Sequence, residues 1–128
     1  MTRSRLQQAA LALLVLAFGA CAGQGSSRGE VELAEFYVTS EHDTLKAGTV
    51  ELTVENYGEF THTLVVSDAT GAVIAATDLI EPDAETVLTI DVEPGAYTFT
   101  CRIVKGLDDG TVVDHYERGM VSTVEVVA

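Results

Sequence analysis

Between Val31 and Val127 polar and apolar residues alternate in short runs, and no run has the spacing of an amphipathic helix. These runs are rich in Val, Thr and aromatic residues, which is typical of half-buried β-strands. The pattern predicts seven strands, at residues 31–38, 49–56, 61–67, 71–77, 86–92, 96–101 and 121–127.

Turn-forming residues separate the runs, at positions 46–48, 56–58, 68–71, 81–83 and 93–95. Strands at this spacing indicate an all-β fold, an antiparallel Greek-key β-sandwich or barrel of about seven to eight strands. The sequence shows no internal repeat, so residues 31–128 are expected to form one domain.

The alternation also predicts which unusual side chains point inward. Cys101 shares a strand face with Tyr97 and Phe99, because successive side chains of a strand point to opposite sides. His62 likewise shares its face with Leu64. A thiol and an imidazole are therefore expected to enter the core from the ends of two separate strands.

The first twenty residues have the features of an export signal that is removed. A short basic segment precedes an apolar stretch that is too short to predict a transmembrane span. Cys21 follows directly and resembles the lipid-modified cysteine of bacterial lipoproteins, which predicts a membrane anchor and a flexible tether over residues 21–30. The alternative is cleavage at the A-x-A site Ala20-Cys21-Ala22, which releases a soluble protein.

The charge of the remaining chain limits its partners. Without Arg3 and Arg5 it has five basic and twenty acidic residues, a net charge of −15. Such a surface repels nucleic acid and favours basic partners, in encounters that depend on salt. Acidity that only keeps an exported protein soluble remains the alternative. A monomer is expected.

Residues that bind soft metals are scarce and grouped. The chain has two cysteines, three histidines and two methionines, and Cys101, His115 and Met120 lie within twenty residues. If Cys21 carries a lipid, Cys101 has no disulfide partner, and a free thiol in an oxidising compartment should be buried or metal-bound. His62, Cys101 and His115 form a trigonal set that suits one copper ion, with the thioether of Met120 as a weak axial ligand.

These segments resemble the cupredoxins, the plastocyanin- and azurin-like blue copper proteins, over nearly all of residues 31–127. Asn56, Gly58 and His62 match an Asn-x-Gly-x-x-x-His stretch that supplies the first histidine of the family. Cys101 ends a strand that begins after a Pro-Gly turn, and four residues separate His115 from Met120, as in the family.

The resemblance implies a type 1 copper held by His62, Cys101, His115 and Met120. It also implies that electrons pass through the edge of His115 to redox partner proteins. The acidic surface, in turn, predicts that these partners have a basic docking surface. Thr63 is expected to bond toward the loop of Cys101. His42 lies in a polar turn and is expected to be solvated.

The chain departs from the family in the thirteen residues between Cys101 and His115, where small cupredoxins have only a few. The segment is predicted to form a hairpin that turns at residues 108–110 and brings His115 back toward Cys101. Asp114 and Glu117 flank His115, which argues against the exposed apolar patch that usually surrounds this histidine.

Three functions fit these observations. The first is an extracytoplasmic carrier of single electrons, and the second is a protein that delivers or sequesters copper without redox cycling. The third is a metal-free structural sandwich, which leaves Cys101 unexplained. An enzyme is not expected, because substrate activation needs an open coordination position or a second metal, and His42 is the one histidine left to build it.

Overall fold

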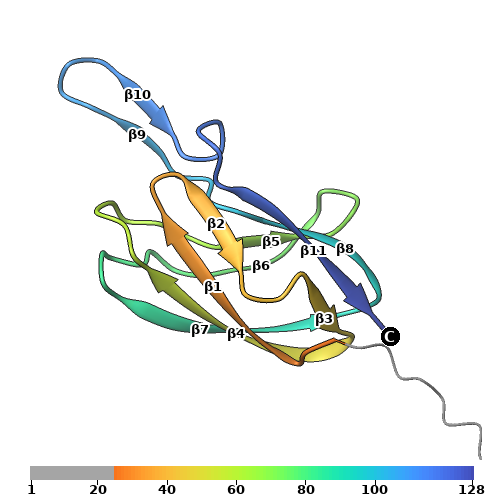
Figure 1. Cartoon of the computed structure of the whole chain (residues 1–128). Helices are drawn as coiled ribbons and strands as arrows, with labels where there is room; N and C mark the ends of the chain where they lie inside the picture. Colours follow the sequence, from red (N-terminus) through yellow and green to blue (C-terminus); the bar gives the residue numbers. More distant parts are fainter. Residues whose placement is uncertain (1–24) are drawn as a thin grey trace, which may run out of the picture.

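The computed structural model describes residues 25–128, which form strands, turns and loops (Figure 1). Within this range eleven strands follow one another: β1 (Arg28–Ala34), β2 (Tyr37–Ser40), β3 (Thr44–Lys46), β4 (Gly48–Asn56), β5 (Val65–Ser67), β6 (Val73–Ala76), β7 (Glu85–Val92), β8 (Gly95–Thr100), β9 (Val104–Gly106), β10 (Val112–Asp114) and β11 (Val121–Val127).

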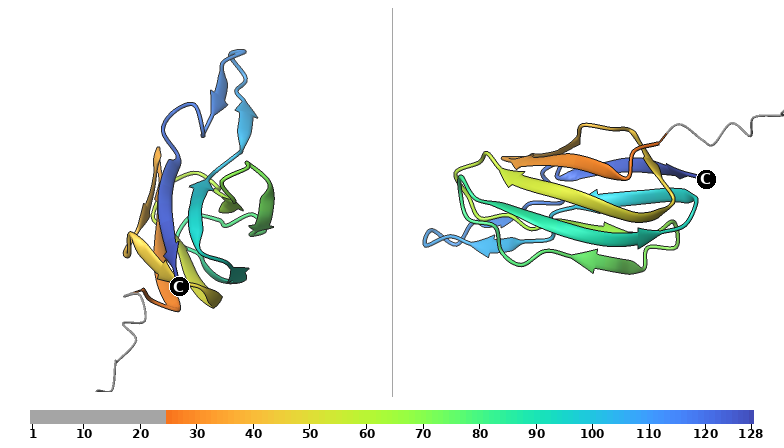
Figure 2. Two further views of the ribbon diagram at one scale, coloured as in Figure 1. Left: turned by 90° about the vertical axis from the view of Figure 1, so that its right-hand side faces the viewer. Right: turned by 90° about the horizontal axis from the view of Figure 1, so that it is seen from below.

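Two sheets pack face to face and form the predicted sandwich (Figure 2). One sheet has the order β2-β1-β4-β7, and the other has the order β3-β11-β8-β5-β6. The sandwich is confirmed, but its sheets are mixed and not strictly antiparallel as predicted, because β1 pairs with β4 and β3 pairs with β11 in parallel. β2 runs back beside β1 in the first sheet, β3 joins the second sheet, and β4 then returns to the first sheet parallel to β1.

The predicted strand over residues 31–38 is in fact a hairpin. β1 and β2 are antiparallel, with Ala34 opposite Tyr37, so Glu35 and Phe36 form the turn between them. This turn contains no Gly, Pro, Asn or Asp, the residues that mark turns in a sequence. The turn therefore carried no sequence signal. The short strand β3 was missed as well.

The remaining strand predictions are close to the structure. The run at 61–67 forms regular strand only from Val65, while His62 makes an isolated bridge with Ile80. The hairpin predicted between Cys101 and His115 is present as β9 and β10, and it projects beyond the sandwich (Figures 1 and 2).

The core lies between the two sheets and confirms the predicted inward faces. Cys101 and Phe99 are completely buried and Tyr97 nearly so, and His62 and Leu64 are completely buried. The core also contains aliphatic side chains from both sheets, including Val31, Leu33, Val50, Leu52, Val54, Val66, Val124 and Val126. A close-packed core of this kind holds its inward-facing side chains in fixed positions.

The described residues begin at Gly25, and β1 begins at Arg28. Residues 28–30, which were predicted to belong to the flexible tether, therefore lie in a sheet. Cys21 and the export signal lie outside the described residues. Within residues 25–128 there is no helix with the length and apolar character needed to cross a membrane.

Candidate metal centre

The structure brings three of the four predicted ligands together. Cys101 directly follows β8, His62 lies in the loop between β4 and β5, and His115 follows β10. One donor atom from each lies within 4.8 Å of the other two, and all three side chains are buried. These residues come from three separate segments, which meet at the end of the sandwich where β9 and β10 project (Figure 1).

The three donor atoms form a compact triangle. The two Nδ1 atoms are 3.1 Å apart, and Sγ of Cys101 lies 3.9 Å from Nδ1 of His62 and 3.6 Å from Nδ1 of His115. One point in its plane is about 2.1 Å from all three atoms, close to the length of a bond from nitrogen or sulfur to a first-row metal ion. Converging buried acceptors repel one another unless a proton or cation lies between them. The residues therefore fit a metal ion.

Asn56 holds the loop that carries His62. Its Nδ2 donates to the carbonyl oxygens of Phe60, at 2.8 Å, and Ile80, at 2.9 Å, while its Oδ1 accepts from the N–H of Gly58 at 2.8 Å. His62 and Ile80 also exchange two backbone hydrogen bonds. These bonds fix the direction in which the imidazole of His62 leaves the backbone.

Backbone hydrogen bonds also connect the other three predicted ligands. The N–H of Cys101 donates to the carbonyl of Met120 at 3.2 Å, and the N–H of Met120 donates to the carbonyl of His115 at 3.1 Å. His115 in turn donates to the carbonyl of Ile103 at 3.0 Å. The hairpin thus returns His115 to Cys101, as predicted. Met120 is completely buried, and its backbone bonds to both Cys101 and His115.

The surroundings of Cys101 favour its thiolate. Burial raises the pKa of the thiol, but hydrogen bonds from His62 and from the backbone N–H of Thr63 outweigh it, and the pKa is lowered. The N–H of Thr63 lies 3.4 Å from Sγ, and its hydroxyl lies 3.7 Å away, so the expected bond from Thr63 is present. Because the thiolate is the form that binds metals, these contacts prepare Cys101 as a ligand.

The pKa values of the two imidazoles shift in opposite directions. Burial, and then the charge of His62, lower the pKa of His115, which keeps it in the neutral form that binds metal. Burial alone lowers the pKa of His62 too, but Cys101 and Glu35 more than offset it, and the pKa is raised. The negative charges of Cys101 and Glu35 therefore favour a positive charge at or next to His62.

Glu35 is a residue that the sequence analysis missed. Its Oε1 lies 2.8 Å from Nε2 of His62, on the side of the ring away from the triangle. Its two carboxylate oxygens also accept backbone hydrogen bonds from Glu59, at 2.9 Å, and Phe60, at 2.8 Å. Glu35 lies in a run that has the pattern of a strand, so no local signal marked it.

Two phenylalanines cover His115. The ring of Phe36 meets the imidazole edge-on at a centroid distance of 5.3 Å, and the ring of Phe60 stacks on it at 6.3 Å. His115 is only 1% exposed, and its Nε2 is buried without a hydrogen-bond partner. The edge of this histidine is therefore not at the surface.

An apolar surface nevertheless lies over the centre, against the expectation from Asp114 and Glu117. His115 lines a pocket together with Phe60, Leu79 and Val104, and these three are 40%, 66% and 60% exposed. Asp114 instead accepts a hydrogen bond from the N–H of Glu117, within the turn after β10. The apolar residues come from other segments, so the neighbours of His115 in the sequence did not predict them.

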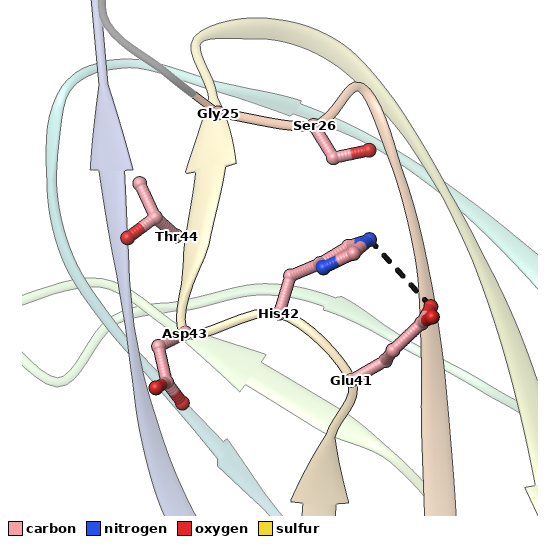
Figure 3. A pocket seen from close by; sticks show the side chains of 6 residues that line it. All are labelled: Gly25, Ser26, Glu41, His42, Asp43 and Thr44. Carbon is pink, nitrogen blue, oxygen red and sulfur yellow. Dashed lines mark ion pairs between the residues drawn. The ribbon is translucent and has the colours of Figure 1, made fainter.

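His42 lies apart from the centre, in a pocket beside the start of β3 (Figure 3). Gly25, Ser26 and Thr44 also line this pocket. Nε2 of His42 lies 3.5 Å from a carboxylate oxygen of Glu41, and the two side chains are 42% and 55% exposed. This position agrees with the expectation of a solvated turn.

Comparison with protein families gives one match, to the family described as a cupredoxin-like domain, over residues 8–113. The match ends before His115 and Met120, so their assignment rests on the resemblance noted above and on their position in the structure. Among curated protein sequences none matches the chain.

Solved structures of copper proteins share the fold. The dithionite-reduced auracyanin of Roseiflexus castenholzii is 20% identical, with a TM-score of 0.63 over 81% of this chain and 99% of that one. Auracyanin A of Chloroflexus aurantiacus, described as a "blue" copper protein, is 15% identical, with a TM-score of 0.55 over 80% and 99%. Rusticyanin of Thiobacillus ferrooxidans is 18% identical, with a TM-score of 0.55 over 80% and 79%.

Proposed function

The chain belongs to the cupredoxin-like family, and from this premise we propose that it carries single electrons with one mononuclear type 1 (blue) copper ion and is not an enzyme. The observation that carries the proposal is the triangle of two imidazole Nδ1 atoms and one thiolate. Two nitrogens and one soft sulfur in a trigonal arrangement are the ligand set of electron-transfer copper sites. The fold shared with auracyanin and rusticyanin supports the same conclusion.

Each ligand has a distinct role in this proposal. Cys101 supplies the thiolate, His62 and His115 supply the imidazoles, and Met120 supplies the weak axial thioether. When bound, copper supplies a one-electron couple between Cu(II) and Cu(I). Cu(I) prefers soft sulfur and Cu(II) prefers nitrogen, so a ligand set of both kinds serves the two oxidation states.

The rigidity of the centre favours electron transfer over copper delivery. His62, Cys101 and His115 are buried, and backbone hydrogen bonds tie each of them to a neighbouring segment. Buried ligands in a packed core rearrange little when one electron is added or removed. A delivery protein instead needs ligands that release the ion to an acceptor, which calls for exposed or mobile side chains.

Electrons reach the surface through the rings around His115. Since the edge of His115 is covered, the stacked ring of Phe60, which is 40% exposed, continues the route outward. Phe60, Leu79 and Val104 form the apolar contact surface for a redox partner. The acidic body of the protein, with a charge of −15 after removal of the signal, favours a partner with a basic docking surface.

We place the protein outside the cytoplasmic membrane, attached by a lipid on Cys21. The first twenty residues have the features of an export signal, and the tether that follows keeps the domain close to the membrane. A soluble exported form, cleaved at Ala20-Cys21-Ala22, is the alternative.

Addition of one equivalent of Cu(II) to the purified domain tests the function directly. We expect the intense absorption of a thiolate-to-copper charge-transfer band, loss of the colour on reduction, and its return on oxidation. No colour contradicts the type 1 site. Colour without reversible reduction, together with rapid transfer of copper to a chelator, favours delivery over electron transfer.

A further inference from the structure

The carboxylate of Glu35 makes a set of hydrogen bonds that connects it firmly to His62 and to its loop. It accepts from the imidazole and from two successive backbone N–H groups, at 2.8 to 2.9 Å, and its side chain is 23% exposed. The turn between β1 and β2 thereby joins the loop of residues 56–62, which carries the ligand. Three hydrogen bonds at one carboxylate hold it in a single orientation.

Gly58 provides the space for this carboxylate. A Cβ atom added at Gly58 lies 2.3 Å from Oε1 of Glu35 and 2.7 Å from Oε2. No side chain can therefore occupy position 58 while Glu35 stays in place. The glycine of the Asn-x-Gly-x-x-x-His stretch has a steric role in this chain: it admits Glu35 to His62.

The hydrogen bond sets the state of the imidazole. An ionised carboxylate only accepts hydrogen bonds, so Nε2 of His62 carries the proton and donates it. Nδ1, the atom that faces His115 and Cys101, is therefore the nitrogen of His62 that can bind a metal ion. A carboxylate that accepts from a ligand imidazole also raises the basicity of the ligand and fixes its ring.

We propose that Glu35 is a positioning residue that lowers the reduction potential of the copper centre by stabilising Cu(II) on His62 more than Cu(I). The inference rests on the proposed function of the site. Its physical basis is that the negative charge of the carboxylate, hydrogen-bonded to the imidazole, compensates the additional positive charge of Cu(II), which Cu(I) does not carry. A neutral hydrogen-bond acceptor at the same place lacks this charge.

The test compares Glu35→Gln, Glu59→Gln and Gly58→Ala with the wild type. Glu35→Gln keeps the size of the side chain and removes its charge. Glu59→Gln is the matched control, because it removes an exposed charge from the same loop, and no hydrogen bond joins its side chain to His62. Gly58→Ala keeps both charges but displaces the carboxylate from His62.

We expect Glu35→Gln to weaken Cu(II) binding about tenfold with little change for Cu(I), which raises the potential by about 59 mV for one electron. Gly58→Ala should also raise the reduction potential, and Glu59→Gln should leave the potential near the wild-type value. Voltammetry gives the potentials, and competition with chelators gives the two affinities. Circular dichroism of the copper-free proteins shows whether each variant folds.

An unchanged potential in Glu35→Gln, or an equal shift in Glu59→Gln, overturns the inference. If Glu35→Gln does not fold, Gly58→Ala decides the question, because it retains every charged group. A wild type that binds copper without the blue band contradicts the proposed function instead. The ratio of Cu(II) affinities between wild type and Glu35→Gln then still decides the role of Glu35.

Discussion

At the scale of single residues, the proposed ligands differ in how much each contributes to the centre. Cys101 is a soft, charged donor that Thr63 and His62 stabilise, whereas Met120 is a neutral thioether. The thiolate should therefore determine whether the site forms, and the thioether should adjust the balance between Cu(II) and Cu(I).

Cys101→Ser should abolish the blue band and weaken Cu(I) binding strongly, because a hydroxyl stays protonated and is a hard donor. The copper-free fold should lose only about 1–2 kcal/mol, since the volume changes little and the N–H of Thr63 can still donate. Absorption spectra and denaturant unfolding measure the two effects. A retained blue band places the metal at other residues.

Met120→Leu should keep the copper and the colour but raise the reduction potential. The thioether donates electron density that Cu(II) needs more than Cu(I), and a tenfold change in that preference corresponds to about 59 mV. Met120→Gln should lower the potential, since a harder oxygen donor favours Cu(II). Voltammetry of the three proteins is decisive: shifts in the same direction for both variants, or no shift, exclude Met120 as the axial ligand.

At the scale of elements, loops position the centre and strands hold the loops. His62 projects from an irregular segment that Asn56 and Ile80 hold through hydrogen bonds, and His115 projects from the turn after β10. Loops commonly carry functional residues because a rigid sheet beneath them fixes their ends. Asn56, which bonds three backbone groups, is therefore expected to fix the position of His62.

Asn56→Ala should destabilise the copper-free protein by about 2–4 kcal/mol, because the carbonyl of Phe60 and the N–H of Gly58 lose the side chain that they bond, and the carbonyl of Ile80 loses one of two donors. Copper affinity should fall as well, since the loop of His62 loosens. Denaturant unfolding measures the loss of stability. Thr49→Val is the control: it removes an exposed hydrogen bond to Asp91 and should change stability by less than about 0.5 kcal/mol. Equal effects of the two substitutions contradict the role given to Asn56.

At the scale of the whole molecule, we expect charge and attachment to govern the encounter with the proposed partners. The proposed contact surface of Phe60, Leu79 and Val104 is apolar, whereas the body of the protein is strongly acidic. Apolar contact then provides the close approach that electron transfer needs, and the charge provides the attraction from a distance.

Electron transfer to a basic partner protein should slow about tenfold or more as salt is raised, because salt screens the attraction over a Debye length of about 8 Å at physiological ionic strength. Stopped-flow rates against ionic strength measure this dependence. An acidic partner of similar potential should show the opposite slope. Rates with the basic partner that do not depend on salt contradict electrostatic docking.

Cys21→Ala should release the protein from the membrane or leave it with its signal attached, because it removes the lipid acceptor. The acidic body has no attraction to an anionic bilayer that could replace the anchor. Fractionation and mass spectrometry of the N-terminus measure both outcomes. A wild-type protein that is already soluble and begins after Ala22 establishes the A-x-A cleavage instead.

Much of the fold was predictable because strand patterns are local. Alternation with a period of two residues showed that His62 and Cys101 point inward, and an Asp-Gly pair marked the hairpin before His115. The ordered set of scarce Cys, His and Met residues indicated a copper centre before any distance was known. The triangle of donor atoms agrees with that set.

Other features arose only when distant segments met in the folded chain. The parallel pairing of β1 with β4, the tight turn at Glu35 and Phe36, and the covering of His115 by Phe60 have no local sequence pattern. Glu35 and His62 are 27 positions apart, and their contact depends on how two loops pack at one end of the sandwich. Periodicity reports the face of a strand on which a side chain lies, whereas the neighbour it meets is decided by tertiary packing.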